Sequence, residues 1–159
     1  MTTPLEFLAS THDGAKKIAR VSKIISAPPA QIFELLANPS THAVIDGSGS
    51  IKSAQENAPT RLALGTKFGM RMKVGVPYKI TNEVVEFDEG SRVAWRHFGG
   101  HIWRYILEAV DGGTRVTEEF DYASAKSPLF LKVMGYPDKN RKAMERTLLR
   151  MQEYFTTRA

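Results

Sequence analysis

The feature that most constrains the fold is a long series of alternating apolar and polar residues, followed by one amphipathic segment. In residues 67–74, KFGMRMKV, the apolar residues Phe68, Met70, Met72 and Val74 alternate with polar or small neighbours. This is the pattern of a strand with one buried face. Alternation recurs as far as residue 122, and DGGT at 111–114 is a strong hairpin signal. We therefore predict about six antiparallel strands.

The end of the chain is predicted to form the only long helix. From Asp138 to Phe155, apolar residues recur at helical spacing, and basic residues cover the other side. A solvated face is the simplest interpretation of that basic side, and docking to an anionic surface is the alternative. A sheet with one apolar face must bury that face against another layer. This helix is the only long element available to cover it, so we predict an α+β fold.

The first part of the chain supplies shorter elements. We predict a strand over residues 16–26, a short helix within APPAQIFELLANPS that ends at Pro39, and one more helical turn before a glycine-rich loop. Residues 1–15 are polar and irregular, and are interpreted as a loosely ordered extension. Residues 16–159 then form a single domain, since no linker or repeat interrupts them.

Composition excludes several classes of protein. The chain has no cysteine, and hence no disulfide or thiolate metal site, and no cofactor is predicted. Its net charge of +5 is interpreted as diffuse, and no nucleic-acid-binding motif accompanies it, so we expect no nucleic-acid partner. No apolar run approaches twenty residues, so no stable membrane insertion is expected. Without a secretory signal pattern, a cytoplasmic location is predicted.

Several segments resemble the START/Bet v 1-like helix-grip (SRPBCC) superfamily, and its polyketide cyclase/dehydrase-like members in particular. They are SAPPAQIFELLANPSTH, VVEFDEGSRVAWRH, GGTRVTEEFDY and the C-terminal helical segment. The resemblance implies a helix-grip fold, in which a curved antiparallel β-sheet wraps around a long C-terminal α-helix. It also implies an elongated hydrophobic cavity between sheet and helix, open at one end. It does not imply one chemistry, because the superfamily includes carriers, cyclases, hydroxylase domains and chaperone co-factors.

Such a cavity would be lined by the inward residues of the strands and the helix. The candidate ligand-binding residues are Met70, Met72, Tyr78, Trp95, His97, Trp103, Tyr105, Glu118, Phe120 and Met144. Plain core packing is the alternative for the aromatic residues and methionines. Glu118 is unusual because an unpaired carboxylate on an apolar face is costly. A one-residue bulge would instead turn it outward. His42 and Asp46 are placed by the resemblance near the cavity entrance.

Three functions are consistent with these sequence features. The first is binding of a small hydrophobic or amphipathic molecule such as a lipid, polyketide or aromatic metabolite. The second is cyclase-like acid–base chemistry, with His97 as general base and Glu118 and Tyr78 as further catalytic candidates. The third is a protein-interaction module with a filled core. His97 and His101 lack a third ligand at short spacing, so no metal site is predicted.

Overall fold

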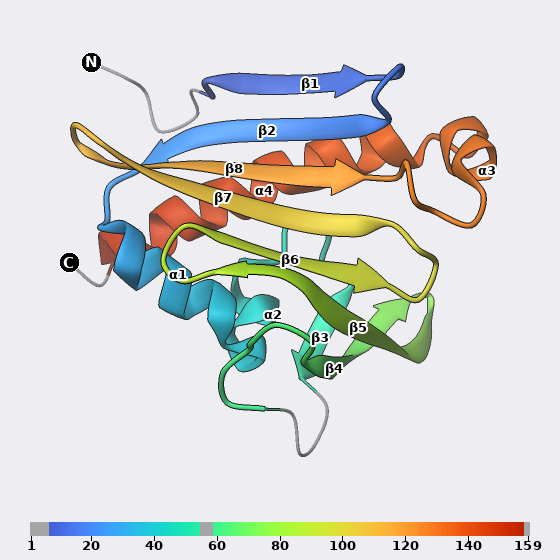
Figure 1. Cartoon of the computed structure of the whole chain (residues 1–159), viewed down its shortest axis with the longest axis horizontal. Coiled ribbons are helices and arrows are strands. Elements are labelled where there is room, and N and C mark those ends of the chain that lie inside the picture. Colours follow the sequence, from blue (N-terminus) through green and yellow to red (C-terminus); the bar gives the residue numbers. More distant parts are fainter. Residues whose placement is uncertain (1–6, 55–58, 158–159) are drawn as a thin grey trace.

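The computed structural model describes residues 7–54 and 59–157, which form one eight-stranded antiparallel sheet and its covering helices (Figure 1). The sheet order is β1-β2-β8-β7-β6-β5-β4-β3. The strands are β1 (Ala9–Asp13), β2 (Ile18–Ile25), β3 (Ile51–Ala54), β4 (Lys67–Val74), β5 (Val76–Asp88), β6 (Arg92–His97), β7 (Ile102–Val110) and β8 (Gly113–Asp121). The helices are α1 (Pro29–Ala37), the 3-10 turn η1 (Pro39–Thr41), α2 (His42–Ile45), α3 (Pro128–Val133) and α4 (Tyr136–Thr157). The predicted helix-grip fold is confirmed. From residue 67 onward the structure has five consecutive antiparallel strands, β4 to β8, where about six were predicted, and the short strand β3 precedes them.

The β7–β8 hairpin follows the prediction made from DGGT. Val110 pairs with Gly113 around a two-residue turn, and Gly112 has φ of +86°, a conformation that favours glycine. A Cβ atom on Gly113 would lie 2.0 Å from the carbonyl oxygen of Ile25. The glycine therefore lets the end of β2 approach the hairpin closely, where β2 pairs with β8, the last strand.

The long helix α4 covers the inner face of the sheet. It packs against β2 and β8, and Figure 1 shows it crossing the sheet from the α3 end to the α1 end. Its Met144, Leu148 and Met151 are buried together with Val21 and Val116 from those two strands. Burial of such apolar surface stabilises the fold by roughly 25 cal/mol per Å². None of the described helices is both long enough and apolar enough to cross a bilayer.

The N-terminal segment differs from its prediction. Residues 9–13, expected to belong to a loosely ordered extension, form β1 and pair with β2 from Ala9–Ser22 to Asp13–Ile18. The strand is held by backbone pairing and polar contacts, including a 2.8 Å hydrogen bond from Arg141 to the Ser10 hydroxyl. Because these contacts need no apolar alternation, the sequence pattern did not reveal them. The domain therefore begins before residue 16, and residues 1–6 lie outside the described residues.

One end of the molecule gathers three connecting segments. Figure 1 shows α3, the β6–β7 turn and the β4–β5 hairpin at the end opposite α1 and the C-terminus. The Ser127 hydroxyl accepts a 3.3 Å hydrogen bond from Phe130 N–H at the start of α3, and Gly135, with φ of +76°, separates α3 from α4. A serine cap thus begins α3, and a glycine with positive φ ends it.

Candidate ligand-binding cavity

A cavity of about 830 Å³ lies between the inner face of the sheet and helices α2, α3 and α4. Its wall includes every residue that the sequence nominated for ligand binding: Met70, Met72, Tyr78, Trp95, His97, Trp103, Tyr105, Glu118, Phe120 and Met144. Asp46 and His42 also line it. These residues therefore share one cavity, and their role in ligand binding stays a prediction.

A cluster of packed aromatic rings forms one side of this wall. The His42 ring stacks on Trp95 at 4.9 Å between centroids. Phe68 meets Trp95 edge-on at 5.6 Å, and Tyr105 lies 5.8 Å from the same ring. Trp95 is only 8% exposed. This part of the wall is rigid because each ring is fixed by its neighbours.

The predicted position of His42 at the entrance is wrong. The residue is buried, and its Nε2 lies 2.8 Å from the backbone carbonyl of Leu36. Burial lowers the pKa of His42 to about 4, so its ring is neutral at pH 7. Asp46, by contrast, is partly exposed and accepts a 2.9 Å hydrogen bond from Ile51 N–H. His42 therefore belongs to the interior wall, and the Asp46 carboxylate holds the loop that follows α2.

Glu118 is the main polar group of the interior. It faces inward, is 4% exposed, and its Oε1 accepts a 2.8 Å hydrogen bond from the Tyr105 hydroxyl. Its Oε2 is buried without a hydrogen-bond partner among the described residues. Burial raises the pKa of Glu118 to about 8; the nearby Asp46 charge also raises it, and the Tyr105 hydrogen bond opposes the shift. The carboxyl group is consequently mostly protonated at pH 7.

A second buried polar group, Asn82, was missed from the sequence. It lines the cavity, is 4% exposed, and its Oδ1 has no partner within the described part of the chain. The pairing of β5 with β6 shifts register only between Val84 and Glu86, so the alternation is still regular at Asn82. Continuing the alternation of Ile80 by one step places Asn82 inside. That signal was present in the sequence.

His97 and His101 stack on each other at 4.3 Å beside the Gly99-Gly100 turn. The pKa values of His97 and His101 are lowered to about 4 and about 3, mainly by burial. Gly99 N–H donates to Nδ1 of His97 at 3.0 Å. A neutral ring that accepts at Nδ1 carries its proton on Nε2, so its remaining nitrogen is a donor. No group of three metal-ligating side chains occurs among residues 7–54 and 59–157.

Tyr78 lies at a different depth from the other two catalytic candidates. Tyr78 is 43% exposed, whereas Glu118 is almost fully buried. Partial burial raises the pKa of Tyr78 above its ordinary value. In the described structure, no hydrogen bond joins any two of Tyr78, His97 and Glu118. The structure thus places all three on one cavity without assembling them into a hydrogen-bonded catalytic group.

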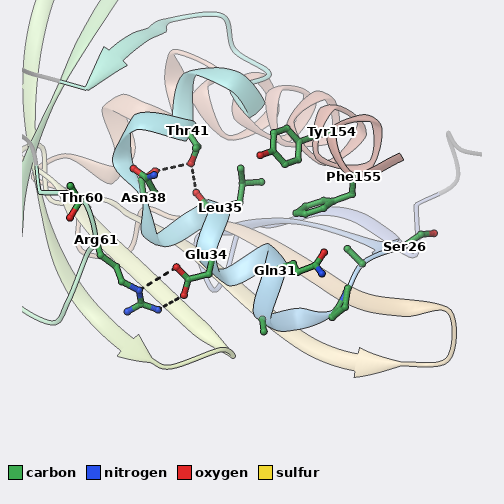
Figure 2. A pocket seen from close by; sticks show the side chains of 13 residues that line it. Ser26, Gln31, Glu34, Leu35, Asn38, Thr41, Thr60, Arg61, Tyr154 and Phe155 are labelled. Atoms are coloured by element: carbon green, nitrogen blue, oxygen red, sulfur yellow. Dashed lines mark hydrogen bonds and ion pairs between the residues drawn. The ribbon is translucent and has the colours of Figure 1, made fainter. Parts of the chain in front are cut away.

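A second hollow, shown in Figure 2, lies between α1 and the last turns of α4 and has a volume of about 880 Å³. Tyr154 and Phe155 close one side of it, and on the other Arg61 pairs with Glu34 at 2.7 Å. None of the described side chains that line it has a buried polar atom without a partner. The hollow contains none of the predicted site residues, so the interior cavity is the candidate site.

A curved sheet that grips a long helix around one cavity defines a helix-grip domain of the SRPBCC superfamily. Within that class, the family model described as "Polyketide cyclase / dehydrase and lipid transport" matches residues 17–156. The chain therefore belongs to this family.

Known proteins agree with this assignment. The chain is 35% identical over 148 residues to the uncharacterized protein Rv0088 of Mycobacterium tuberculosis, a match that covers 89% of this chain. It spans 65% of the length of that relative. Among solved structures, protein Ms6760 of Mycobacterium smegmatis has a TM-score of 0.73 at 20% identity, over 97% of this chain and all of the other. The Polyketide_cyc-like protein Cgl2372 of Corynebacterium glutamicum has a TM-score of 0.60 at 18% identity, over 89% and 92% of the two chains.

Proposed function

We propose that this domain binds a small hydrophobic or amphipathic molecule, such as a lipid, polyketide or aromatic metabolite, in the interior cavity. The observation that carries the proposal is a mostly apolar cavity of about 830 Å³ that contains two buried polar atoms without partners. Small-molecule sites have this size and this combination of apolar wall and few polar groups. The name of the family, which includes lipid transport, is consistent with such a ligand.

The polar atoms indicate how a ligand would be oriented. Protonated Glu118 can donate a hydrogen bond to a ligand carbonyl, and the Asn82 Oδ1 can accept one from a ligand hydroxyl. Buried polar atoms that gain such partners lose their desolvation penalty. A neutral polar end, rather than a carboxylate, therefore fits this part of the wall. The apolar body of the ligand would lie against Trp95 and Trp103.

The cyclase-like alternative has weaker support. It requires His97 to accept a proton, but the lone pair of Nδ1 is already engaged by Gly99 N–H. His97 would have to give up this hydrogen bond before it could act as a base there. If the enzyme alternative held, His97→Ala would abolish turnover while ligand binding stayed nearly unchanged. The interaction-module alternative predicted a filled core, and the cavity speaks against it.

Native mass spectrometry of protein purified from its own host tests the proposal directly, since a bound ligand would appear as an added mass. In parallel, an environment-sensitive apolar dye should bind the folded protein with a fluorescence increase. Trp103→Ala should change dye affinity without unfolding the domain, as monitored by circular dichroism. Absence of both co-purified ligand and dye binding, in protein shown to be folded, would contradict the proposal.

A further inference from the structure

Exposed apolar side chains are concentrated around the mouth of the cavity. Val74, Tyr78, Phe98, Phe130 and Tyr136 line the cavity and are nevertheless 40–68% exposed. Four neighbours in the same segments are 48–75% exposed: Val76, Leu129, Val133 and Met134. These nine residues are called the apolar rim below. They represent nine of the thirteen large hydrophobic residues that are exposed in the described structure, so the rim is a patch and not a random scatter.

The rim comes from the three segments that Figure 1 shows at one end of the molecule: the β4–β5 hairpin, the β6–β7 turn, and α3 with the start of α4. The contribution of α3 is the clearest. None of its residues is buried, although its first turn is capped by Ser127. A helix that buries no side chain gains little from packing against its own domain. Leu131 packs partly against the core, whereas Leu129, Phe130 and Val133 are available to another surface.

Positive charge is concentrated in the same segments, contrary to the diffuse distribution expected from the sequence. Residues 67–80 and 123–142 contain nine of the 22 lysines and arginines but only one of the 17 acidic residues. They carry a net charge of +8, and the remainder of the chain carries −3. The single carboxylate, Asp138, lies 3.4 Å from Arg141. Lys126, Lys132 and Lys139 are exposed beside the rim.

We propose that the apolar rim and its lysines form a docking face for an anionic lipid bilayer. Apolar side chains that insert at the boundary between headgroups and acyl chains, with lysines at the level of anionic headgroups, are the features of a peripheral membrane-binding surface. A bilayer can accept flexible, loosely arranged apolar groups without a shape-matched partner. Docking on this face would set the mouth of the cavity against the lipid, so that an apolar ligand could pass between them without crossing water.

Sedimentation with vesicles tests this proposal. The protein should bind vesicles of phosphatidylcholine mixed with phosphatidylglycerol at least about tenfold more strongly than vesicles of phosphatidylcholine alone. Each lysine near an anionic surface contributes about fivefold to affinity. Binding should weaken in about 1 M salt, where the Debye length is only about 3 Å. Lys132→Gln should reduce binding by about this fivefold factor.

A matched pair of leucine variants tests the position of the face. Leu129, in α3, is 71% exposed, and Leu64, outside the rim, is 67% exposed; neither lines the cavity. Leu129→Asp should weaken vesicle binding by about tenfold or more, since it removes an inserted apolar group and adds a negative charge. Leu64→Asp makes the same chemical change and should have little effect. Both variants should keep dye affinity in the cavity.

The outcomes separate this proposal from the binding function. Dye binding without any vesicle binding would overturn the docking face and leave the cavity function intact. Equal losses for Leu64→Asp and Leu129→Asp would also overturn it, because the effect would then be independent of the rim. Binding to an acidic protein surface but not to anionic vesicles would assign the face to a protein partner and refute the bilayer. Vesicle binding without either dye binding or a co-purified ligand would support docking and contradict the cavity function.

Discussion

At the scale of single residues, the buried Glu118 makes the stability of the domain depend on pH between about 4.5 and 8. Its pKa is raised from 4.5 to about 8, so between these values the folded state holds a proton that the unfolded state has lost. The contribution is fully present below pH 4.5 and is lost as the pH rises toward 8. We expect the free energy of unfolding to fall by on the order of 4 kcal/mol over this window because of this residue.

Glu118→Gln should remove this dependence. In urea unfolding, the free energy of unfolding of the variant should fall less than that of the wild type between pH 5 and pH 8. This range lies between the unfolded and folded pKa values of Glu118. Glu108→Gln, a change of an exposed carboxylate on the same hairpin, serves as the control and should behave like the wild type. Parallel pH profiles for the Glu118 variant and the wild type would show that the carboxyl is not protonated in the folded protein. Ligand affinity should change only moderately, since an amide still donates and accepts hydrogen bonds.

His42 has the opposite effect at acidic pH. Its pKa is lowered from 6.5 to about 4 by burial, so the unfolded chain binds a proton before the folded chain does. The stabilising contribution is present above pH 6.5 and is lost as the pH falls toward 4, by about 3 kcal/mol. His42→Phe should reduce the loss of stability over this range in urea unfolding. The variant should keep part of the pH dependence of the unfolding free energy, because His97 and His101 also contribute to it. An unchanged pH dependence would contradict the burial of a neutral His42.

The residues of the cavity also show how far sequence reasoning can reach. Strict alternation placed Trp95 inside, because period two fixes the face of every residue in a regular strand. For Glu118 the sequence left an outward bulge open, and its 4% exposure in the structure decides for the inner face. Asn82 was missed although it follows Ile80 by one step of the alternation, since the register of β5 shifts only after Val84. The burial of His42 could not be derived, since it depends on the path of a short helical turn relative to Trp95 and Leu36.

At the scale of elements, the loop after α2 is fixed to α4 through Gly47. Gly47 N–H donates to the Thr147 hydroxyl at 2.9 Å, and Arg146 Nε donates to the Gly47 carbonyl at 2.7 Å. A Cβ atom on Gly47 would lie 2.2 Å from the backbone carbonyl oxygen of Ala143. Glycine is therefore required by the close approach of two backbones, and this contact fixes the loop whose Asp46 and Ser48 line the cavity.

Gly47→Ala should destabilise the domain by about 1–3 kcal/mol, because a rigid helix backbone cannot move away from the added methyl group. Urea unfolding measures the change. Gly49→Ala is less suitable as a control because Gly49 has φ of +73°. Gly14→Ala is suitable, since a Cβ there would meet no atom within 4 Å. Equal effects of the Gly47 and Gly14 variants would contradict the proposed tight contact.

The edge of the sheet shows a different limit of prediction. The strands β4 to β8 were predictable because each buries one apolar face. Strand β1 lies at the edge and is held by backbone pairing and by Ser10, Arg141 and Glu145. Such polar contacts join residues more than a hundred positions apart, and a local pattern does not contain them.

At the scale of the whole molecule, the sheet and α4 enclose an internal space. This space distinguishes a ligand-binding domain from a domain with a filled core. Ala143, on α4, lines the cavity and is 7% exposed, whereas Ala37, in α1, is fully buried and does not line it. The same substitution can therefore be made beside an empty space at Ala143 and within a packed core at Ala37. Ala143→Phe should place its ring in the cavity, and Ala37→Phe should overpack the core.

We expect Ala143→Phe to weaken binding of an apolar dye by at least about tenfold while the free energy of unfolding changes by less than about 1.5 kcal/mol. Ala37→Phe should cost about 1–3 kcal/mol or more, and the protein that remains folded should bind dye as the wild type does. Fluorescence titration and urea unfolding measure the two quantities. If Ala143→Phe destabilised the domain as much as Ala37→Phe, the space beside α4 would be filled in solution. Undiminished dye binding by Ala143→Phe would place the dye elsewhere, because Ala143 belongs to the wall of the cavity.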